Sequence, residues 1–175
     1  MQDTCLTANK MHRSYRALSY TDRAVRSICM PLLTTVARRT PSDLLLATEA
    51  LLLLAVFRLS LAVVPVRRIL RAITPGPVQP AQDISPDAAT LATAIRVRWA
   101  IEAVTRNSPA EFVCFPQTLA GYVMLRRRGV PSTMVYGVAR SPQGELLAHT
   151  WLMVGDRTVV GGEGSQAFSP IERWS

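Results

Sequence analysis

Two side chains in this sequence have the chemistry of a nucleophile and its proton acceptor: Cys114 and His149. The chain of 175 residues holds three cysteines and two histidines, so few such pairs are available. Cys114 precedes a segment that predicts a helix, with Pro116 in its first turn. Free N–H groups and the positive end of the helix dipole favour a thiolate there, and the same N–H groups can stabilise an oxyanion. Cys114 is therefore a candidate nucleophile for acyl transfer.

His149 lies in Ala148-His149-Thr150-Trp151, a segment that predicts a β-strand. Alternation along a strand places His149 and Trp151 on the same face. Taken alone, each candidate has an ordinary interpretation: a cysteine can pack as a small apolar side chain, and a strand histidine can be structural. The order of cysteine, helix, strand, turn and histidine-bearing strand is more specific. A thiol at a helix N-terminus facing an imidazole on a neighbouring strand is a known catalytic arrangement.

The elements around these residues predict an α+β fold, with helices first and a small antiparallel sheet last. The expected domain segments are a basic N-terminal segment at 1–40, an apolar helix and Pro-rich linker at 41–80, and a core at 81–175. Expected elements are helices at 44–64 (cap Ser42 or Asp43, end at Pro65), 87–105 (cap Ser85) and 116–128 (ended by Gly129), then strands Thr133–Ala139, Leu146–Val154 and Arg157–Val160.

The first of these helices belongs to the most apolar part of the chain. Glu49 and Arg58 interrupt its apolar run, whereas a membrane span needs about 20 nearly uncharged residues. Each charge at the centre of a span costs about 2.5–3.5 kcal/mol. We therefore expect a buried helix, with a membrane span as the alternative. No secretory leader pattern opens the sequence, so we expect a cytoplasmic protein, with membrane association left open.

The stretch from Cys114 to Pro131 resembles the leader peptidase of lasso peptide biosynthesis, a branch of the transglutaminase-like and papain-like cysteine protease superfamily. The resemblance continues in Tyr136-Gly137-Val138-Ala139-Arg140 and in Leu147-Ala148-His149-Thr150-Trp151. The apolar helix running into Pro65 is also similar, so the resemblance covers roughly residues 44–165. It implies a core in which a nucleophile helix packs on a small antiparallel sheet.

By this resemblance, Cys114 is the nucleophile, and His149 is first its base and then the acid for the leaving amine. The substrate would be a ribosomally made precursor peptide, cut between leader and core on a route of antibiotic (RiPP) biosynthesis. A separate asparagine-synthetase-like, ATP-dependent cyclase would then close the core peptide. A leader-binding protein, the RiPP recognition element, would deliver the precursor. Because only about 40 residues precede the apolar helix, we expect this element to be a separate protein.

The third member of the catalytic set is where this sequence departs from the family. The family usually has an acidic residue about twelve positions after the histidine, and here that position is Gly161. Asp156, at the predicted hairpin tip, would lie about 20 Å from His149 along the strand. A two-residue turn pairs His149 with Gly162, and a three-residue turn pairs it with Glu163. Glu163 is thus the candidate orienting carboxylate, with a backbone carbonyl or an Asn/Gln side chain as the alternative.

Composition narrows the remaining classes. The net charge of +8 predicts an anionic partner, such as an acidic precursor or its carrier. The arginine clusters lack interleaved aromatic residues, so we expect no nucleic acid. The His and Cys spacing fits no zinc site and Gly161-Gly162-Glu163-Gly164 fits no phosphate loop, so we expect neither metal nor cofactor. Gln117 and Asn107 are candidate oxyanion donors.

The sequence therefore favours a cysteine endopeptidase, with two alternatives: a catalytically idle scaffold that positions precursor for the cyclase, and a membrane-anchored helical protein.

Overall fold

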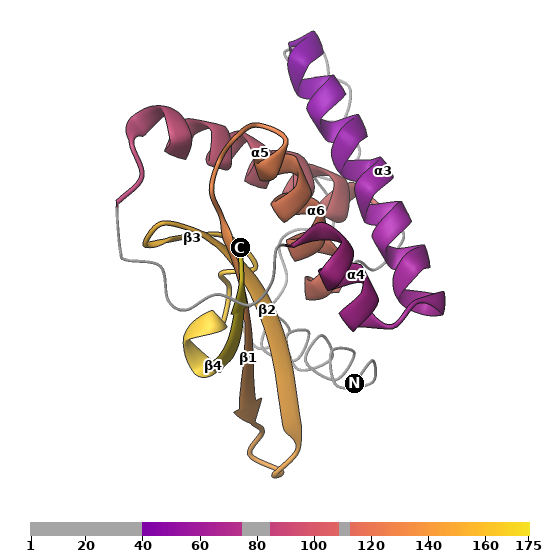
Figure 1. Cartoon of the computed structure of the whole chain (residues 1–175), viewed down its shortest axis with the longest axis vertical. Helices are drawn as coiled ribbons and strands as arrows, with labels where there is room; N and C mark the ends of the chain where they lie inside the picture. Colours follow the sequence, from indigo (N-terminus) through magenta and orange to yellow (C-terminus); the bar gives the residue numbers. More distant parts are fainter. Residues whose placement is uncertain (1–39, 75–84, 109–112) are drawn as a thin grey trace, which may run out of the picture.

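The computed structural model describes residues 40–74, 85–108 and 113–175. All but the last residue of the predicted basic segment at 1–40, and most of the Pro-rich linker, lie outside the described residues. In the described part, helices precede a four-stranded sheet, which confirms the α+β class (Figure 1). The elements are α3 (Pro41–Val63), α4 (Val66–Ile73), α5 (Ala88–Asn107), α6 (Cys114–Arg126), β1 (Thr133–Arg140), β2 (Leu146–Val154), β3 (Arg157–Val160), the 3-10 turn η1 (Ser165–Ala167) and β4 (Ser169–Trp174).

The strands form one antiparallel sheet in the order β3-β2-β1-β4. The register of β1 and β2 places Gly137 opposite His149. β3 pairs with β2 as far as Leu152 opposite Val160, and a bulge shifts the register between Leu152 and Met153. The chain therefore leaves the edge of β2 before it reaches His149. β4, which the sequence did not predict, forms the opposite edge beside β1.

The N-caps of the two longest helices lie two or three residues away from the predicted caps. The α3 cap is Thr40, whose side chain accepts from the Asp43 N–H while the Asp43 carboxylate reaches back to the Thr40 N–H. The α5 cap is Asp87, which accepts from the Thr90 N–H at 2.7 Å, in place of Ser85. Both corrections have the same cause, because a cap is set by the residue whose side chain can reach the free N–H groups of the first turn.

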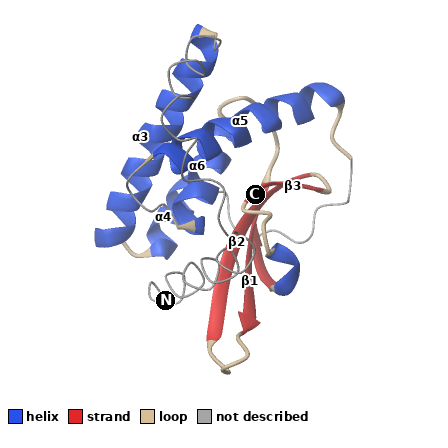
Figure 2. Cartoon of the chain, turned by 180° about the vertical axis from the view of Figure 1, so that it is seen from behind, coloured by secondary structure: helices blue, strands red, loops and turns tan. Residues whose placement is uncertain are grey.

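Helix α6 lies at the centre of the molecule. It contacts α3 and α5 on one side and strands β1, β2 and β3 on the other, and Figure 2 shows it between these layers. Gly121 allows the closest approach: a Cβ there would lie 2.9 Å from Leu152 Cδ2 and 3.2 Å from Ile101 Cδ1. The middle of α6 is therefore held tightly between α5 and the sheet.

Helix α3 is buried on one side only, which corrects the expectation of a buried helix. Leu46, Ala50, Leu54 and Phe57 face the core. On the other side, Leu45, Leu52, Leu59 and Val63 are 61–81% exposed. By length and composition α3 is apolar enough to cross a membrane, although its inner side packs against α5 and α6. Pro65 separates it from α4, as predicted.

Candidate active site

Cys114 is the first residue of α6 and is half-buried. The residue before it, Val113, is the N-cap and provides no side-chain hydrogen bond to the first turn. Val113 thus does not cap the N–H groups of this turn, and N–H groups at a helix N-terminus favour a negative charge on the sulfur or on a bound oxyanion. The helix start that the sequence predicted near Pro116 lies two residues earlier, at the cysteine itself.

The imidazole of His149 is held by the main chain of Gly161. Its Nε2 atom lies 2.7 Å from the Gly161 carbonyl oxygen. A carbonyl can only accept a hydrogen bond, so Nε2 carries the proton in the neutral ring. The lone pair is then on Nδ1, which is the nitrogen left to accept a proton from a thiol. The hydrogen bond to Gly161 thus fixes the tautomer that a general base needs.

The protonation of His149 is coupled to Cys114. Burial of the imidazole lowers the pKa of His149, but the hydrogen bond with the Cys114 side chain, the charge of Cys114 and the Gly161 carbonyl together outweigh burial. The pKa of His149 is therefore held above its ordinary value of 6.5. The structure thus brings together the two residues that the sequence singled out, as a hydrogen-bonded acid–base pair.

Two aromatic rings restrict the imidazole. Trp151 stacks on it, with centroids 6.0 Å apart and planes 24° apart, and Phe168 lies tilted at 5.1 Å. Gly137 makes room for the indole, since a Cβ there would lie 2.7 Å from Trp151 Cη2. Aromatic contacts of this kind limit the ring to a narrow range of orientations.

The geometry at Gly161 explains why no acidic side chain occupies this position. Its φ is +72°, and a Cβ would lie 2.6 Å from the Thr150 carbonyl oxygen. Only glycine fits this backbone, and its carbonyl oxygen is the partner of His149 Nε2. The side chain of Glu163 is exposed, and its orienting role stays a prediction.

The other predicted site residues lie less centrally. Gln117 is half-buried in the first turn of α6, and its role as an oxyanion donor stays a prediction. Asn107 donates its amide to the Ala103 carbonyl of its own helix at 2.6 Å. Among the described residues, no group of three or more His, Cys, Asp or Glu side chains could hold a metal ion.

Sequence reasoning missed a buried polar contact beside the pair. Thr118 Oγ1 lies 3.0 Å from the Cys114 carbonyl oxygen and 3.2 Å from Thr150 Oγ1. The signal was available, because Thr118 follows Cys114 by one helical turn and Thr150 follows His149 directly.

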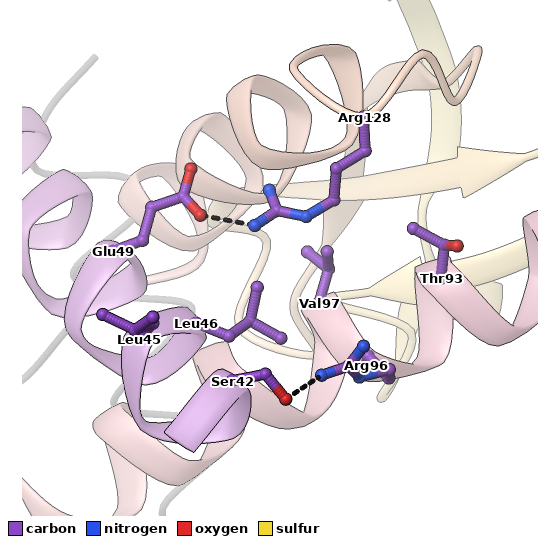
Figure 3. Close-up of a pocket in the computed structure, with 8 residues that line it drawn as sticks. All are labelled: Ser42, Leu45, Leu46, Glu49, Thr93, Arg96, Val97 and Arg128. Carbon is purple, nitrogen blue, oxygen red and sulfur yellow. Dashed lines mark hydrogen bonds and ion pairs between the residues drawn. The ribbon is translucent and has the colours of Figure 1, made fainter. Parts of the chain in front are cut away.

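A cavity of about 510 Å³ lies near the other end of α6, lined by residues of α3 and α5 and by Arg128 (Figure 3). The arginines on its rim are already paired with polar groups. Arg128 contacts Glu49 at 2.6 Å, and Arg96 contacts Ser42 at 3.2 Å and Asp43 at 3.1 Å. Neither Cys114 nor His149 lines this cavity, so it is separate from the candidate active site.

The fold and the pair define a class: a thiol at a helix N-terminus, hydrogen-bonded to an imidazole on an antiparallel sheet, is the arrangement of thiol-dependent acyl transfer. The family model of the transglutaminase-like superfamily matches residues 51–173, and the chain belongs to this superfamily, which includes cysteine peptidases. The match runs from the middle of α3 to the end of β4 and contains both Cys114 and His149. No curated protein and no solved structure matches the chain significantly.

Proposed function

We propose that this protein is a cysteine endopeptidase that removes the leader from a lasso peptide precursor. The observation that carries the proposal is the hydrogen-bonded pair of Cys114 and His149 at the N-terminus of α6, within a transglutaminase-like domain. The resemblance of residues 114–131 and 147–151 to lasso leader peptidases supports the choice of substrate. Among the acyl-transfer activities of the superfamily, this resemblance favours peptide-bond hydrolysis in a precursor peptide.

The geometry supports a two-step mechanism. His149 Nδ1 takes the proton of the Cys114 thiol, and the thiolate attacks the scissile carbonyl. The N–H groups of the first turn of α6 stabilise the oxyanion of the tetrahedral intermediate. The imidazolium then gives its proton to the leaving amine, leaving the leader as a thioester on Cys114. His149 finally activates a water molecule that hydrolyses this thioester.

In this mechanism the Gly161 carbonyl does the work of an orienting group without a full negative charge. It keeps the proton on Nε2 and the ring in place, as a side-chain amide does in some cysteine peptidases. A neutral carbonyl stabilises the imidazolium less than a carboxylate does, because the attraction is to a dipole. The hydrogen bond and charge of Cys114 supply the larger part of what raises the pKa of His149.

The partners follow from the same proposal. A separate leader-binding protein brings the precursor to the peptidase, and an asparagine-synthetase-like cyclase takes the released core peptide. The net charge of +8 supports an acidic precursor or carrier. The proposed location is the cytoplasm. The exposed leucines of α3 leave membrane association as the alternative.

One observation favours a second candidate function. An acidic side chain is absent at Gly161, and an idle relative of the peptidase would tolerate this change. Such a protein would keep the fold and position precursor for the cyclase. If the protein were such a scaffold, it would not need the Cys114 thiol to support cyclisation.

Mass spectrometry of a candidate precursor, incubated with this protein and its leader-binding partner, tests the proposal. The wild type is expected to release the leader, and Cys114→Ala to lower the rate by at least about 10³-fold. Cys29→Ala is the matched control and is expected to cleave at the wild-type rate. Equal cleavage by Cys114→Ala would overturn the proposal. Failure of the wild type to cleave, together with support of cyclisation by Cys114→Ala, would establish the scaffold instead.

A further inference from the structure

Two buried threonines link the helix that carries the thiol to the strand that carries the imidazole. Thr118 and Thr150 are each 2% exposed. The Thr118 hydroxyl lies 3.0 Å from the Cys114 carbonyl oxygen, 3.2 Å from Thr150 Oγ1 and 3.3 Å from the Thr150 carbonyl oxygen. Neither threonine touches the reacting atoms, so any effect on the chemistry acts through their neighbours.

The hydroxyl protons define a direction for this link. Thr118 Oγ1 has one proton and two carbonyl oxygens within reach, and it donates at the shorter distance, 3.0 Å, to Cys114 rather than at 3.3 Å to Thr150. Thr118 Oγ1 then accepts the proton of Thr150 Oγ1. The result is a chain of two hydrogen bonds from Thr150 through Thr118 to the main chain of Cys114. Its first member is the residue that follows His149 in β2.

We propose that Thr118 and Thr150 are a positioning pair that fixes the distance and angle between Cys114 and His149. Between α6 and β2, the apolar approach of Gly121 to Leu152 holds the two elements together but contains no directional bond, and the Cys114–His149 bond is the contact whose geometry has to be fixed. A hydrogen bond between buried groups is directional and is costly to break. The pair therefore sets where the first turn of α6 lies along β2.

The consequence for catalysis rests on the proposed function, but the positioning itself does not. A displacement of about 1 Å between catalytic groups can lower a rate by about 10²-fold. Transfer of the thiol proton to His149 also depends on this distance. The pair should thus affect both the cleavage rate and the intrinsic reactivity of Cys114, and reactivity can be measured without any precursor.

The test is the rate of Cys114 alkylation by iodoacetamide from pH 5 to pH 9, followed by mass spectrometry of the peptide that contains Cys114. We expect Thr118→Val to move the midpoint of the pH profile upward by about one unit, toward the free-thiol value of about 8.5. Reaction at pH 6 would slow about tenfold. Thr118→Ser keeps the hydroxyl and should restore the wild-type profile.

Thr93→Val is the matched control. The Thr93 hydroxyl donates to the Ala89 carbonyl at 3.0 Å, the same type of bond one turn back in a helix, but in α5 and outside the site. Its pH profile should equal that of the wild type. Should Thr118→Val fail to fold by circular dichroism, Thr150→Val removes the other hydroxyl and provides the same test. The double valine variant should be no slower than Thr118→Val alone, because the Thr118 hydroxyl takes part in every hydrogen bond of the pair.

An unshifted profile in the folded Thr118→Val or Thr150→Val variant would overturn the positioning role, and so would an equal shift in Thr93→Val or a failure of Thr118→Ser to restore the profile. The two proposals fail separately. If no precursor is cut but the valine profiles shift as expected, the peptidase function falls and the positioning pair stands.

Discussion

Helices α3 and α6 are both apolar, yet they differ in how the fold uses them. Eight of the thirteen residues of α6 are buried, against four of the twenty-three in α3. Helix α6 is enclosed by α3, α5 and the sheet, whereas α3 contacts its neighbours on one side. The difference teaches that neighbours, rather than hydropathy, decide burial. The nucleophile is on the enclosed helix, where a site can be held rigidly.

The two ends of α6 differ as well. The N-terminal end at Cys114 is tied to the sheet by His149 and the threonine pair. The C-terminal end is tied to α3 by exposed ion pairs, from Arg127 and Arg128 to Glu49. Buried hydrogen bonds hold geometry, while exposed ion pairs contribute about 0–1 kcal/mol each. The expected outcomes that follow test these two contrasts.

The largest expected difference lies within α3. Leu54 is fully buried, and Leu54→Ala should lower the free energy of unfolding by about 2–5 kcal/mol. Leu52 is 61% exposed, and Leu52→Ala should change the free energy of unfolding by less than about 0.5 kcal/mol. Chemical denaturation monitored by circular dichroism measures both. Equal losses in the two variants would mean that the outer side of α3 is covered by something that packs as a core does.

A smaller difference separates two glycines with nearly the same φ. Gly161 has φ +72° and a carbonyl oxygen 2.6 Å from the position of a Cβ, whereas Gly129, at the C-terminal end of α6, has φ +69° and no atom within 4 Å. Gly129→Ala should lose about 1 kcal/mol of stability from the left-handed backbone alone. Gly161→Ala should lose more, about 1–3 kcal/mol.

Gly161→Ala should also slow Cys114 alkylation, because it moves the carbonyl that holds His149 Nε2. Gly129→Ala should leave alkylation unchanged. Chemical denaturation and Cys114 alkylation, measured on the same samples of the two glycine variants, test both expectations. If the two variants behave alike, the close contact at Gly161 does not shape the site.

The smallest effect is expected at the link between α3 and α6. Burial raises the pKa of Glu49, but its hydrogen bonds to Arg128 and Arg127 outweigh burial and hold the pKa below 4.5. The Glu49 carboxyl thus binds a proton more readily in the unfolded chain than in the folded protein. The stabilising contribution of the ionised carboxylate is therefore present above pH 4.5 and is lost as pH falls through the pKa of the folded protein. Because the side chains of this ion-pair group are only partly buried, Glu49→Gln should lower the free energy of unfolding at pH 7 by at most about 1 kcal/mol. The difference in free energy of unfolding between Glu49→Gln and the wild type should vanish near pH 3. A difference that persists at pH 3 would not come from the charge of Glu49.

Sequence alone predicted what local patterns determine. The strands Leu146–Val154 and Arg157–Val160 have the predicted bounds, and Gly129 has the expected positive φ, although α6 ends at Arg126, two residues before the predicted end. The juxtaposition of Cys114 with His149 was predicted from the order of elements and from the resemblance. The strand bounds and the conformation of Gly129 depend on local alternation or on a single residue type, whereas the juxtaposition of Cys114 with His149 also needed the order of elements and the resemblance.

Long-range contacts were not predictable in this way. β4 carries Pro170 and exposes most of its residues, so its sequence lacks the alternation of a half-buried strand. The bond from His149 Nε2 uses the main-chain carbonyl of Gly161, and although a backbone carbonyl was one of the alternatives, no residue type reveals which carbonyl takes this place. The exposed side of α3 depends on where α5 and α6 lie, and hydropathy carries no information on that.

The raised pKa of His149 makes folding stability fall as pH rises, whereas the lowered pKa of Glu49 makes stability fall as pH decreases. The folded protein binds this proton more tightly than the unfolded chain, so the contribution is fully present below pH 6.5 and is lost as pH rises through the folded value. Urea denaturation between pH 6 and pH 9 should therefore show wild-type stability falling relative to His149→Gln. A constant difference across this range would contradict the raised value.

The central claim is that the Cys114 thiol and the His149 imidazole share a proton, and NMR titration of the His149 ring tests it most directly. With two histidines in the chain, His149→Gln assigns the signals. The account predicts a His149 pKa above 6.5 in the wild type. In Cys114→Ala, burial outweighs the remaining Gly161 hydrogen bond, so the pKa should fall below 6.5. The same His149 pKa in both proteins would show that the two side chains do not interact, and the proposed catalytic pair would be wrong.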